Sequence, residues 1–349
     1  MSIGIGIVGT GMISNFHARA IADSEHGHLV GCYSRNQANC GAFAAEHGAR
    51  AHDSLESMLA DDSVQVVSVC TPSGAHQDPA LAAAAAGKHV MIEKPLEVTT
   101  EKCDAILDAC ARHNVRLGVT LQSRFHESAR LIKQAVDQGR FGTITMGDAY
   151  VKWYRSQEYY DSGAWRGTWE LDGGGALMNQ AIHSVDLLLW LMGPVRRVHA
   201  MTSTMTHERI EVEDVAIANL EFVSGALGVI EATTTAFPGS LKCVEIAGSH
   251  GSAILEEEDI TQWQFADETE ADEQLRQRMA GQTETGGGAA DPASIGHHGH
   301  KSVYDDFLQS INLDRPPLID GAEGRRSVEL ITAIYESART GRTVDLTTT

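Results

Sequence analysis

Basic side chains are scarce in this sequence. Among its 349 residues, lysine and arginine number 27 against 47 aspartates and glutamates, which gives a formal net charge of −20. A chain this acidic is repelled by phosphate backbones and by anionic lipid surfaces. We therefore exclude nucleic acids and membranes as general partners, whereas a small anionic ligand in a local basic pocket remains compatible with the charge.

The sequence also lacks long apolar runs and paired cysteine motifs. No window approaches the roughly 18 apolar residues of a membrane span, and no basic segment precedes the short apolar run at the start, as a secretion signal requires. None of the six cysteines belongs to a C-x-x-C pair, and Cys32 and Cys70 lie in apolar, strand-like runs. We expect reduced, buried thiols and a cytoplasmic protein.

The first third of the chain alternates between apolar runs and helix-compatible segments. Continuous apolar strands separated by helices are typical of a parallel sheet that is buried on both faces. The length, about twice that of a usual domain, allows a second domain. We predict a doubly wound Rossmann domain over residues 1–123, and its strand-like runs are 3–8, 28–33, 64–70, 89–93 and 115–119.

The alternation of apolar runs and helix-compatible segments ends at about residue 124. A helical pattern at 126–138 is followed by a long β run at 143–155 and by several segments of period two with short turns. Such segments indicate a mostly antiparallel sheet. We predict an α+β second domain over residues 124–349 with an open sheet. Within it, the polar and glycine-rich stretch 267–297 is expected to be a mobile insertion.

A glycine-rich loop follows the first predicted strand. Gly9 permits a tight turn, and Gly11 allows a pyrophosphate to approach the backbone, while the N-terminus of the next helix attracts that anion. Ser14 stands where glycine or alanine is usual, but it is small enough for close helix packing. The loop therefore predicts a dinucleotide cofactor.

The end of the second strand lacks the carboxylate that usually binds the ribose hydroxyl of NAD. Ser34 and Arg35 stand there instead, and both side chains can bind a 2′-phosphate. The sequence thus slightly favours NADP over NAD. The alternative is that Arg35 is a solvated loop residue and that the protein uses NAD without the carboxylate.

Three further motifs point to a family. They are Thr71-Pro72 with His76, Glu93-Lys94-Pro95 after an AGKHV segment, and a triple glycine followed by Asn179 and His183. In this order they resemble the Gfo/Idh/MocA oxidoreductases, which include glucose-fructose oxidoreductase and inositol dehydrogenase, and the resemblance covers essentially the whole chain.

The resemblance implies an enzyme and an architecture. The activity would be that of an NAD(P)-dependent dehydrogenase or reductase that acts on a CH–OH group of a sugar, sugar acid, cyclitol or sugar nucleotide. It also implies a homo-oligomer, either a dimer or a tetramer, and a C-terminal helix at about 321–341 that packs back towards the Rossmann domain. The glycine-rich motif is similar to that of relatives that act on sugar nucleotides or uronates.

Three residues are the predicted catalytic group. Lys94 follows the predicted strand 89–93, at the sheet edge where ligands bind, and its ammonium could neutralise a developing alkoxide. The resemblance implies that it contacts the nicotinamide ribose and the substrate. Asn179 and His183 are four apart and so share a helix face, on which the imidazole could carry a proton. The family usually has aspartate where Asn179 stands, and an amide can orient a hydroxyl but cannot act as a base.

The remaining site predictions concern cofactor and substrate. Glu93 is expected to orient Lys94. The predicted substrate contacts are Arg124, Tyr154, Trp165, Arg166, Asn179 and His183, unless the tryptophan serves as a core or interface anchor. The predicted cofactor contacts are Gly9, Thr10, Gly11, Met12, Ile13, Ser34, Arg35, Thr71, Pro72, His76, Glu93, Lys94 and Gln122.

Two questions stay open at this level. The histidines at 297–300 could touch the substrate or a metal, but they lack the spacing of a recognised metal site, and we predict none. Two other functions also compete with the simple dehydrogenase. One is a glycoside-cleaving enzyme of the same fold that uses transient oxidation, and the other is a non-catalytic nucleotide sensor. The presence of both Lys94 and His183 speaks against the sensor.

Overall fold

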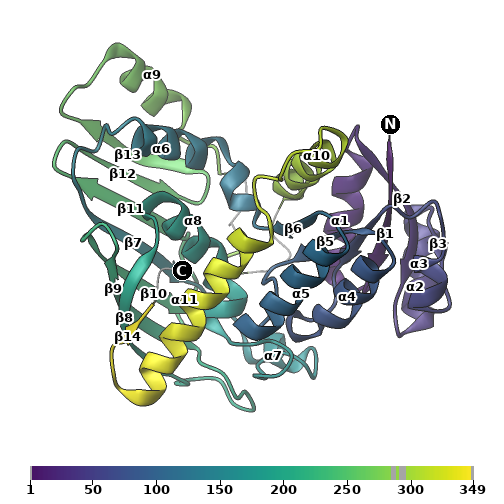
Figure 1. The fold of residues 1–349 in the computed structure, drawn as a ribbon. Helices are drawn as coiled ribbons and strands as arrows, with labels where there is room; N and C mark the ends of the chain where they lie inside the picture. Colours follow the sequence, from purple (N-terminus) through teal and green to yellow (C-terminus); the bar gives the residue numbers. More distant parts are fainter. Residues whose placement is uncertain (1, 284–287, 291–295, 347–349) are drawn as a thin grey trace. The chain divides into compact units, whose positions relative to one another are not determined.

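A computed structural model describes residues 2–283, 288–290 and 296–346 (Figure 1). The chain forms two compact units. The first comprises Met1–Gln122, Glu170–Gly173 and Gly296–Val328, and the second comprises Ser123–Trp169, Gly174–Ile295 and Glu329–Thr349. The chain therefore passes between the units several times. Within the described ranges, no helix combines the length and the apolar character needed to cross a membrane.

The first unit is built on a six-stranded parallel sheet in the order β3-β2-β1-β4-β5-β6. Every residue of β1 and β4 is buried, as expected of strands covered on both faces. The doubly wound Rossmann prediction is confirmed. The strands are β1 (Ile3–Val8), β2 (Gly27–Tyr33), β3 (Arg50–Ala51), β4 (Val66–Val69), β5 (His89–Glu93) and β6 (Leu117–Thr120).

Helices from both ends of the sequence cover this sheet. Helix α4 packs against α5, and α1 packs against α10, which comes from the C-terminal third (Figure 1). A Cβ on Gly118 of β6 would lie 2.6 Å from the Phe307 ring of α10, so this helix sits directly on the strand. The helices are α1 (Met12–Ala22), α2 (Gln37–His47), α3 (Leu55–Leu59), α4 (Gln77–Ala85), α5 (Thr100–Arg112) and α10 (His298–Asn312).

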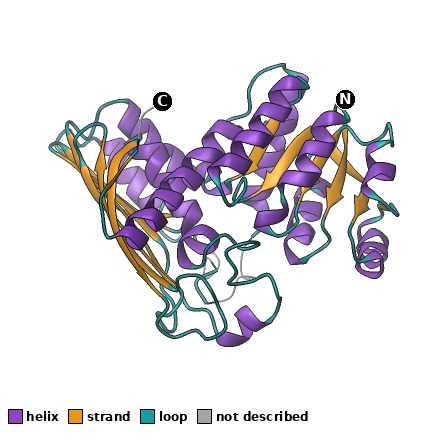
Figure 2. Cartoon of the chain, turned by 60° about the horizontal axis from the view of Figure 1, so that its bottom comes forward, coloured by secondary structure: helices purple, strands orange, loops and turns teal. Residues whose placement is uncertain are grey.

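The second unit contains an eight-stranded sheet in the order β13-β12-β11-β7-β10-β9-β8-β14. All its neighbouring pairs are antiparallel except β7 and β10, which confirms the mostly antiparallel prediction. Figure 2 shows helices against one face of this sheet only. The strands are β7 (Ile144–Lys152), β8 (Val195–Ser203), β9 (Val215–Phe222), β10 (Leu227–Thr233), β11 (Cys243–Gly248), β12 (Gly251–Glu256), β13 (Asp259–Phe265) and β14 (Val344–Asp345).

The helices of the second unit include one, α8, that follows the triple-glycine motif. Helix α8 packs against β7 and β11, and its leucines fill the core. Helix α11 begins in the first unit and ends in the second, since the boundary falls after Val328. The helices are α6 (Glu127–Asp137), α7 (Gln157–Asp161), α8 (Ile182–Met192), α9 (Glu270–Arg278) and α11 (Gly321–Thr340).

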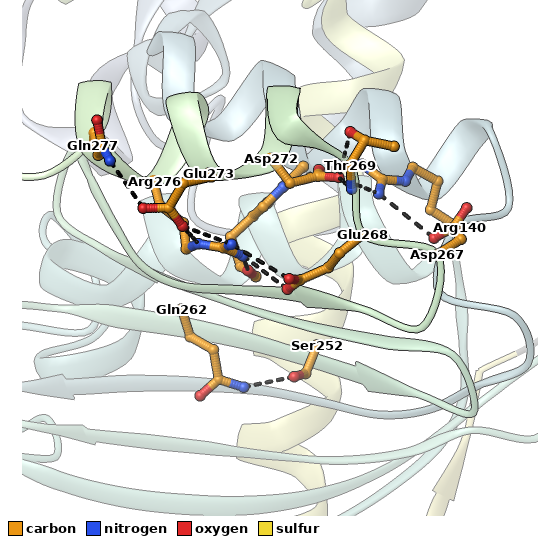
Figure 3. Close-up of polar contacts among 11 residues, drawn as sticks. Arg140, Ser252, Gln262, Asp267, Glu268, Thr269, Asp272, Glu273, Arg276 and Gln277 are labelled. Carbon is orange, nitrogen blue, oxygen red and sulfur yellow. Dashed lines mark hydrogen bonds and ion pairs between the residues drawn. The ribbon is translucent and has the colours of Figure 1, made fainter.

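The expected mobile insertion at 267–297 contains an ordered helix, α9. Thr269 and Asp272 form a capping box at its start. Arg140 donates to both carboxylate oxygens of Asp272, at 2.7 and 3.0 Å, and lowers the pKa of this carboxyl. Figure 3 shows these contacts beside β13. The polar composition predicted a mobile insertion, because composition carries no information about a partner as distant in the sequence as Arg140. Residues 284–287 and 291–295 of that stretch lie outside the described residues.

Candidate active site

The glycine loop between β1 and α1 leaves room for a ligand. Gly9 has φ +93°, and a Cβ there would lie 2.7 Å from the carbonyl oxygen of Cys70, so only glycine fits. A Cβ on Gly11 would meet nothing within 4 Å. No side chain caps the first turn of α1, and Ser14 donates to the Gly11 carbonyl at 2.6 Å. This open helix N-terminus suits a pyrophosphate.

Two predicted cofactor residues carry buried oxygens that the described part of the chain does not satisfy. They are Thr10 Oγ1 in the glycine loop and Gln122 Oε1 after β6. Buried polar atoms normally have a hydrogen-bond partner. A bound dinucleotide would provide one, so the residues present fit such a cofactor.

Ser34 and Arg35 directly follow β2, as predicted. The Arg35 side chain is exposed, and no carboxylate occupies the strand end. The arrangement leaves space for a 2′-phosphate without requiring one.

His76 links two segments that are predicted to contact the cofactor. Its Nδ1 lies 2.9 Å from the carbonyl oxygen of Pro95, and its Nε2 lies 3.0 Å from that of Thr71. The Thr71 hydroxyl donates to the Ala75 carbonyl at 2.9 Å. His76 is buried and its pKa is lowered by burial. Both side chains therefore stabilise the Thr71–His76 turn, and His76 ties this turn to the segment after Lys94.

Lys94 stands out in an otherwise buried stretch, since it is the one residue from Val90 to Val98 that is not fully buried. The preceding Glu93 turns inward, where its carboxylate lies 3.0 Å from Nε2 of His17. The other ring nitrogen of His17 lies 2.8 Å from the Tyr304 hydroxyl, which contacts Ser68 at 2.7 Å. A buried polar chain thus anchors the residue next to Lys94.

His17, Glu93 and His300 are also the described residues whose ligand atoms could hold a metal, since these atoms lie within 4.8 Å of one another. Two observations favour an ion pair instead. Burial would lower the pKa of His17, but Cys70, Tyr304 and Glu93 raise it well above 6.5, and burial of Glu93 is outweighed by His17 and Lys94, so that its pKa is lowered. Both ring nitrogens of His17 are engaged. We therefore assign a charged, hydrogen-bonded pair.

In the second unit, the triple-glycine motif leads into the helix that carries Asn179 and His183. The structure places a π-helical turn at Ala176–Ala181 before α8 begins, where the sequence predicted a plain α-helix. Such turns are frequent at functional sites. From Asp172 to Leu189, Asn179 and His183 are the two side chains that are not buried. The helix therefore leaves this predicted pair partly exposed and buries the residues around it.

A polar cluster surrounds Asn179. Gln180 Nε2 donates to Asn179 Oδ1 at 2.8 Å and to the Tyr159 hydroxyl at 2.9 Å. Arg166 donates to the same hydroxyl at 2.7 Å, and Arg155 donates to Gln180 Oε1 at 2.8 Å. The structure thus brings the predicted Arg166 and Asn179 into one network. Sequence reasoning missed Gln180, Tyr159 and Arg155, although Gln180 adjoins Asn179 in the motif.

The aromatic candidates lie in different settings. The Arg166 guanidinium lies over the Trp165 ring at 4.6 Å, so these two predicted residues are neighbours. Tyr154 packs edge-on against Phe237, with ring centroids 5.2 Å apart. Trp169, a further tryptophan of this segment, packs on a ring of α11.

Arg124 turns inward. Its guanidinium is buried and donates to both carboxylate oxygens of Asp186, at 2.8 and 2.6 Å. This fork supports α8 from within the unit. We therefore leave Arg124 out of the proposed substrate set.

The histidines at 297–300 belong to the first unit. The Nε2 atom of His297 lies 2.7 Å from a carboxylate oxygen of Asp23, and the ring of His298 stacks on the ring of His297. His300 is buried beside His17, and burial lowers its pKa to about 3, so its ring is neutral.

The Rossmann sheet, its open phosphate loop and the Lys94 segment define a nicotinamide-dependent oxidoreductase. Residues 3–121 match the family model described as oxidoreductase family, NAD-binding Rossmann fold, and residues 129–254 match the GFO/IDH/MocA C-terminal domain. The chain belongs to the Gfo/Idh/MocA family of oxidoreductases, as its motifs predicted.

Solved structures and sequences of relatives extend over the whole chain. The WlbA dehydrogenase from Bordetella pertussis, determined with NADH and UDP-GlcNAcA, is 38% identical with a TM-score of 0.89, covering 100% of this chain and 98% of that one. The WlbA enzyme from Chromobacterium violaceum, with the same ligands, is 36% identical with a TM-score of 0.89 and covers 99% and 96%. A myo-inositol 2-dehydrogenase from Thermotoga maritima is 26% identical over 98% of both chains.

Proposed function

We propose that this enzyme is an NAD-dependent dehydrogenase that oxidises a ring hydroxyl of a sugar nucleotide whose sugar carries a carboxylate, of the UDP-GlcNAcA type. The observation that carries the proposal is the likeness to the two WlbA dehydrogenases, at 38% and 36% identity over almost the entire length of both partners. The inositol enzyme, at 26%, is a more distant relative.

The polar cluster of the second unit supports an anionic substrate. In a chain of net charge −20, the partly exposed Arg166 joins the network that reaches Asn179. Arg155 is buried and donates to Gln180 and to the Gly288 and Ala289 carbonyls, so it supports this network from within. Guanidinium groups match carboxylates and phosphates through paired N–H donors. Arg166 is therefore the guanidinium of this network that a substrate anion could pair with.

Each proposed catalytic residue has a role that its chemistry allows. A bound nicotinamide supplies the hydride acceptor, and the open loop at Gly11 with Thr10 and Gln122 would hold the dinucleotide. The Lys94 ammonium would stabilise the alkoxide that forms as the hydroxyl is oxidised. His183 would accept the hydroxyl proton. Asn179, held by Gln180, would orient the hydroxyl through its amide.

NAD is our proposed physiological cofactor, because both WlbA structures contain NADH. The sequence preference for NADP rested on Ser34 and Arg35. We propose that these residues let the enzyme accept NADP as a second cofactor.

A homo-oligomer is the proposed assembly. Figure 2 shows one face of the eight-stranded sheet without helices. Four exposed apolar residues of this sheet form two cross-strand pairs, Met201 with Ile217 and Leu227 with Met146. A second copy of the same chain is the partner that would cover this face.

The test is a substrate screen that follows NADH formation. UDP-GlcNAcA, UDP-GlcNAc, myo-inositol and glucose are each offered with NAD and with NADP. We expect UDP-GlcNAcA to be oxidised and UDP-GlcNAc, which lacks the sugar carboxylate, to be disfavoured by about 10- to 100-fold in kcat/KM, because charged hydrogen bonds to the carboxylate are lost. Faster oxidation of inositol would refute the substrate class. Glycoside cleavage without net NADH would favour the hydrolase, and cofactor binding without turnover would favour the sensor.

A further inference from the structure

The helix that exposes Asn179 and His183 has an unusual beginning. A helix leaves its first four backbone N–H groups without internal partners. Here all four are taken by two distant residues. The N–H groups of Gly175 and Leu177 donate to the Glu213 carboxylate at 3.0 and 2.7 Å. Ala176 donates to the Glu213 carbonyl at 3.1 Å, and Met178 donates to the Tyr335 hydroxyl at 3.3 Å.

Glu213 and Tyr335 also hold each other. The Tyr335 hydroxyl, from α11, donates to Glu213 Oε1 at 3.0 Å. Glu213 is 3% exposed and stands just before β9. Since no side-chain cap comes from within the helix, this pair serves as an external N-cap.

The glycines of the motif are what let this pair come close. A Cβ on Gly175 would lie 1.9 Å from the Glu213 carbonyl oxygen. On Gly174, whose φ is +155°, it would lie 2.0 Å from the Tyr335 hydroxyl oxygen. The close approach of Glu213 and Tyr335 therefore accounts for two of the three consecutive glycines.

We propose that Glu213 is a positioning residue, whose carboxylate, together with Tyr335, fixes the start of the helix and thereby the place of Asn179 and His183. The kinetic part of this inference rests on the proposed function. The carboxylate must be ionised for the role, because three donors converge on its two oxygens. Tyr335 is the titratable group in contact with it, whereas the neighbouring Asp214 turns to the backbone of 205–207 and to His207.

The experiment compares Glu213→Gln with Glu208→Gln, a matched change at an exposed glutamate nearby. Hydrogen exchange of the full-length protein is followed by mass spectrometry. We expect faster exchange of amides 174–184 in Glu213→Gln alone, since an amide offers one acceptor where the carboxylate offers two. In turnover assays kcat should fall by about 10-fold or more, while the Kd for NADH changes by less than about two-fold.

A pH profile separates positioning from a merely structural role. Burial raises the pKa of Glu213 to about 7. The kcat of the wild type should therefore fall as the pH falls through this value. In Glu213→Gln this part of the acidic decline in kcat should disappear, while any part due to His183 should remain. Glu213→Asp, which keeps a carboxylate, should recover some of the activity.

Unchanged exchange at 174–184 in Glu213→Gln would overturn the proposal whatever the activity. If the wild type turns over none of the sugar nucleotides, the proposed function fails, and the exchange result still decides this inference. If Glu213→Gln does not fold, Tyr335→Phe takes its place, because it removes the acceptor for Met178 and a donor to Glu213. Unchanged exchange in Tyr335→Phe would then overturn the proposal.

Discussion

Two side chains after β2 bear on the choice between the nicotinamide cofactors. Arg35 is exposed and Ser34 adjoins it, so both can reach a 2′-phosphate. We expect Arg35→Ala to lower kcat/KM for NADP by about 10-fold, the worth of one charged hydrogen bond, and to leave NAD within about two-fold. Steady-state kinetics with both cofactors measures this. Arg50→Ala, at another exposed arginine of the same unit, is the control, and equal effects on both cofactors would contradict the assignment.

Glu213 should also make stability depend on pH, in the opposite direction to activity. Its folded pKa of about 7 lies above the ordinary 4.5, so the fold favours the protonated form. This contribution is fully present below pH 4.5 and is lost as the pH rises towards 7. The interval corresponds to about 3 kcal/mol. We expect the Tm of Glu213→Gln, relative to that of the wild type, to rise between pH 4.5 and pH 7. The Tm difference between Glu208→Gln and the wild type should not change over this range. A constant difference would contradict this.

At the scale of elements, the sequence predicted what local pattern controls. Continuous apolar runs such as β1 and β4 read directly as buried parallel strands, and the Gly9 turn reads as a phosphate loop. Contacts between residues that are distant in the sequence could not be predicted from it. Arg124 was predicted to bind substrate because its partner, Asp186, is distant in the sequence. The segment that begins at Thr269 was predicted to be a loop because Arg140, which binds Asp272 in its capping box, is also distant.

The helix that carries Asn179 and His183 shows the same difference between local features, which the sequence predicts, and distant contacts, which it does not. Its motif and the exposed pair were visible in the sequence. Its π-helical turn and its external cap were not, since Glu213 stands before a strand and Tyr335 lies in the last helix, and neither belongs to a motif. Sequence patterns reveal which face of a helix is polar, but not which distant group satisfies its first N–H groups.

Two glycines, one just before the π-helical turn and one inside α2, should respond to alanine with opposite signs. At Gly175 a Cβ would lie 1.9 Å from a backbone oxygen, which cannot move aside cheaply, so Gly175→Ala should cost about 2 kcal/mol or more. At Gly41, an exposed position in α2, a Cβ would meet nothing within 4 Å. Gly41→Ala should stabilise by about 1 kcal/mol through helix propensity. Thermal unfolding of both variants measures this, and a Gly175→Ala protein as stable as the wild type would contradict the close approach.

For the whole molecule, the net charge and the local charges have separate meanings. The −20 balance disfavours polyanionic partners, yet the second unit places the partly exposed Arg166 in the network that reaches Asn179. Global charge acts over distances that salt screens, whereas a paired guanidinium acts at hydrogen-bond range. The acidic surface therefore does not conflict with an anionic substrate.

The uncovered face of the eight-stranded sheet argues for association between copies of the chain. Met201 lies directly opposite Ile217 on β8 and β9, and Leu227 lies opposite Met146 on β10 and β7. These side chains are 41–64% exposed, and the two pairs lie on separate cross-strand rows, beside Glu221 and Glu231. Exposed pairs of large apolar groups are candidates for an interaction surface. A sheet face binds a second identical face most simply through two-fold symmetry, since one patch then serves both partners.

We therefore expect an oligomer in light scattering coupled to size exclusion, and a shift to monomers in Met201→Glu/Ile217→Glu. Paired charges on an apolar interface must be desolvated, which costs several kcal/mol. Leu313→Glu, at an exposed leucine of the first unit, is the control that should leave the assembly intact. NADH should still bind the monomer, because its predicted contacts lie in the other unit. A monomeric wild type, or an oligomer that survives the double charge, would rule out this face as the interface.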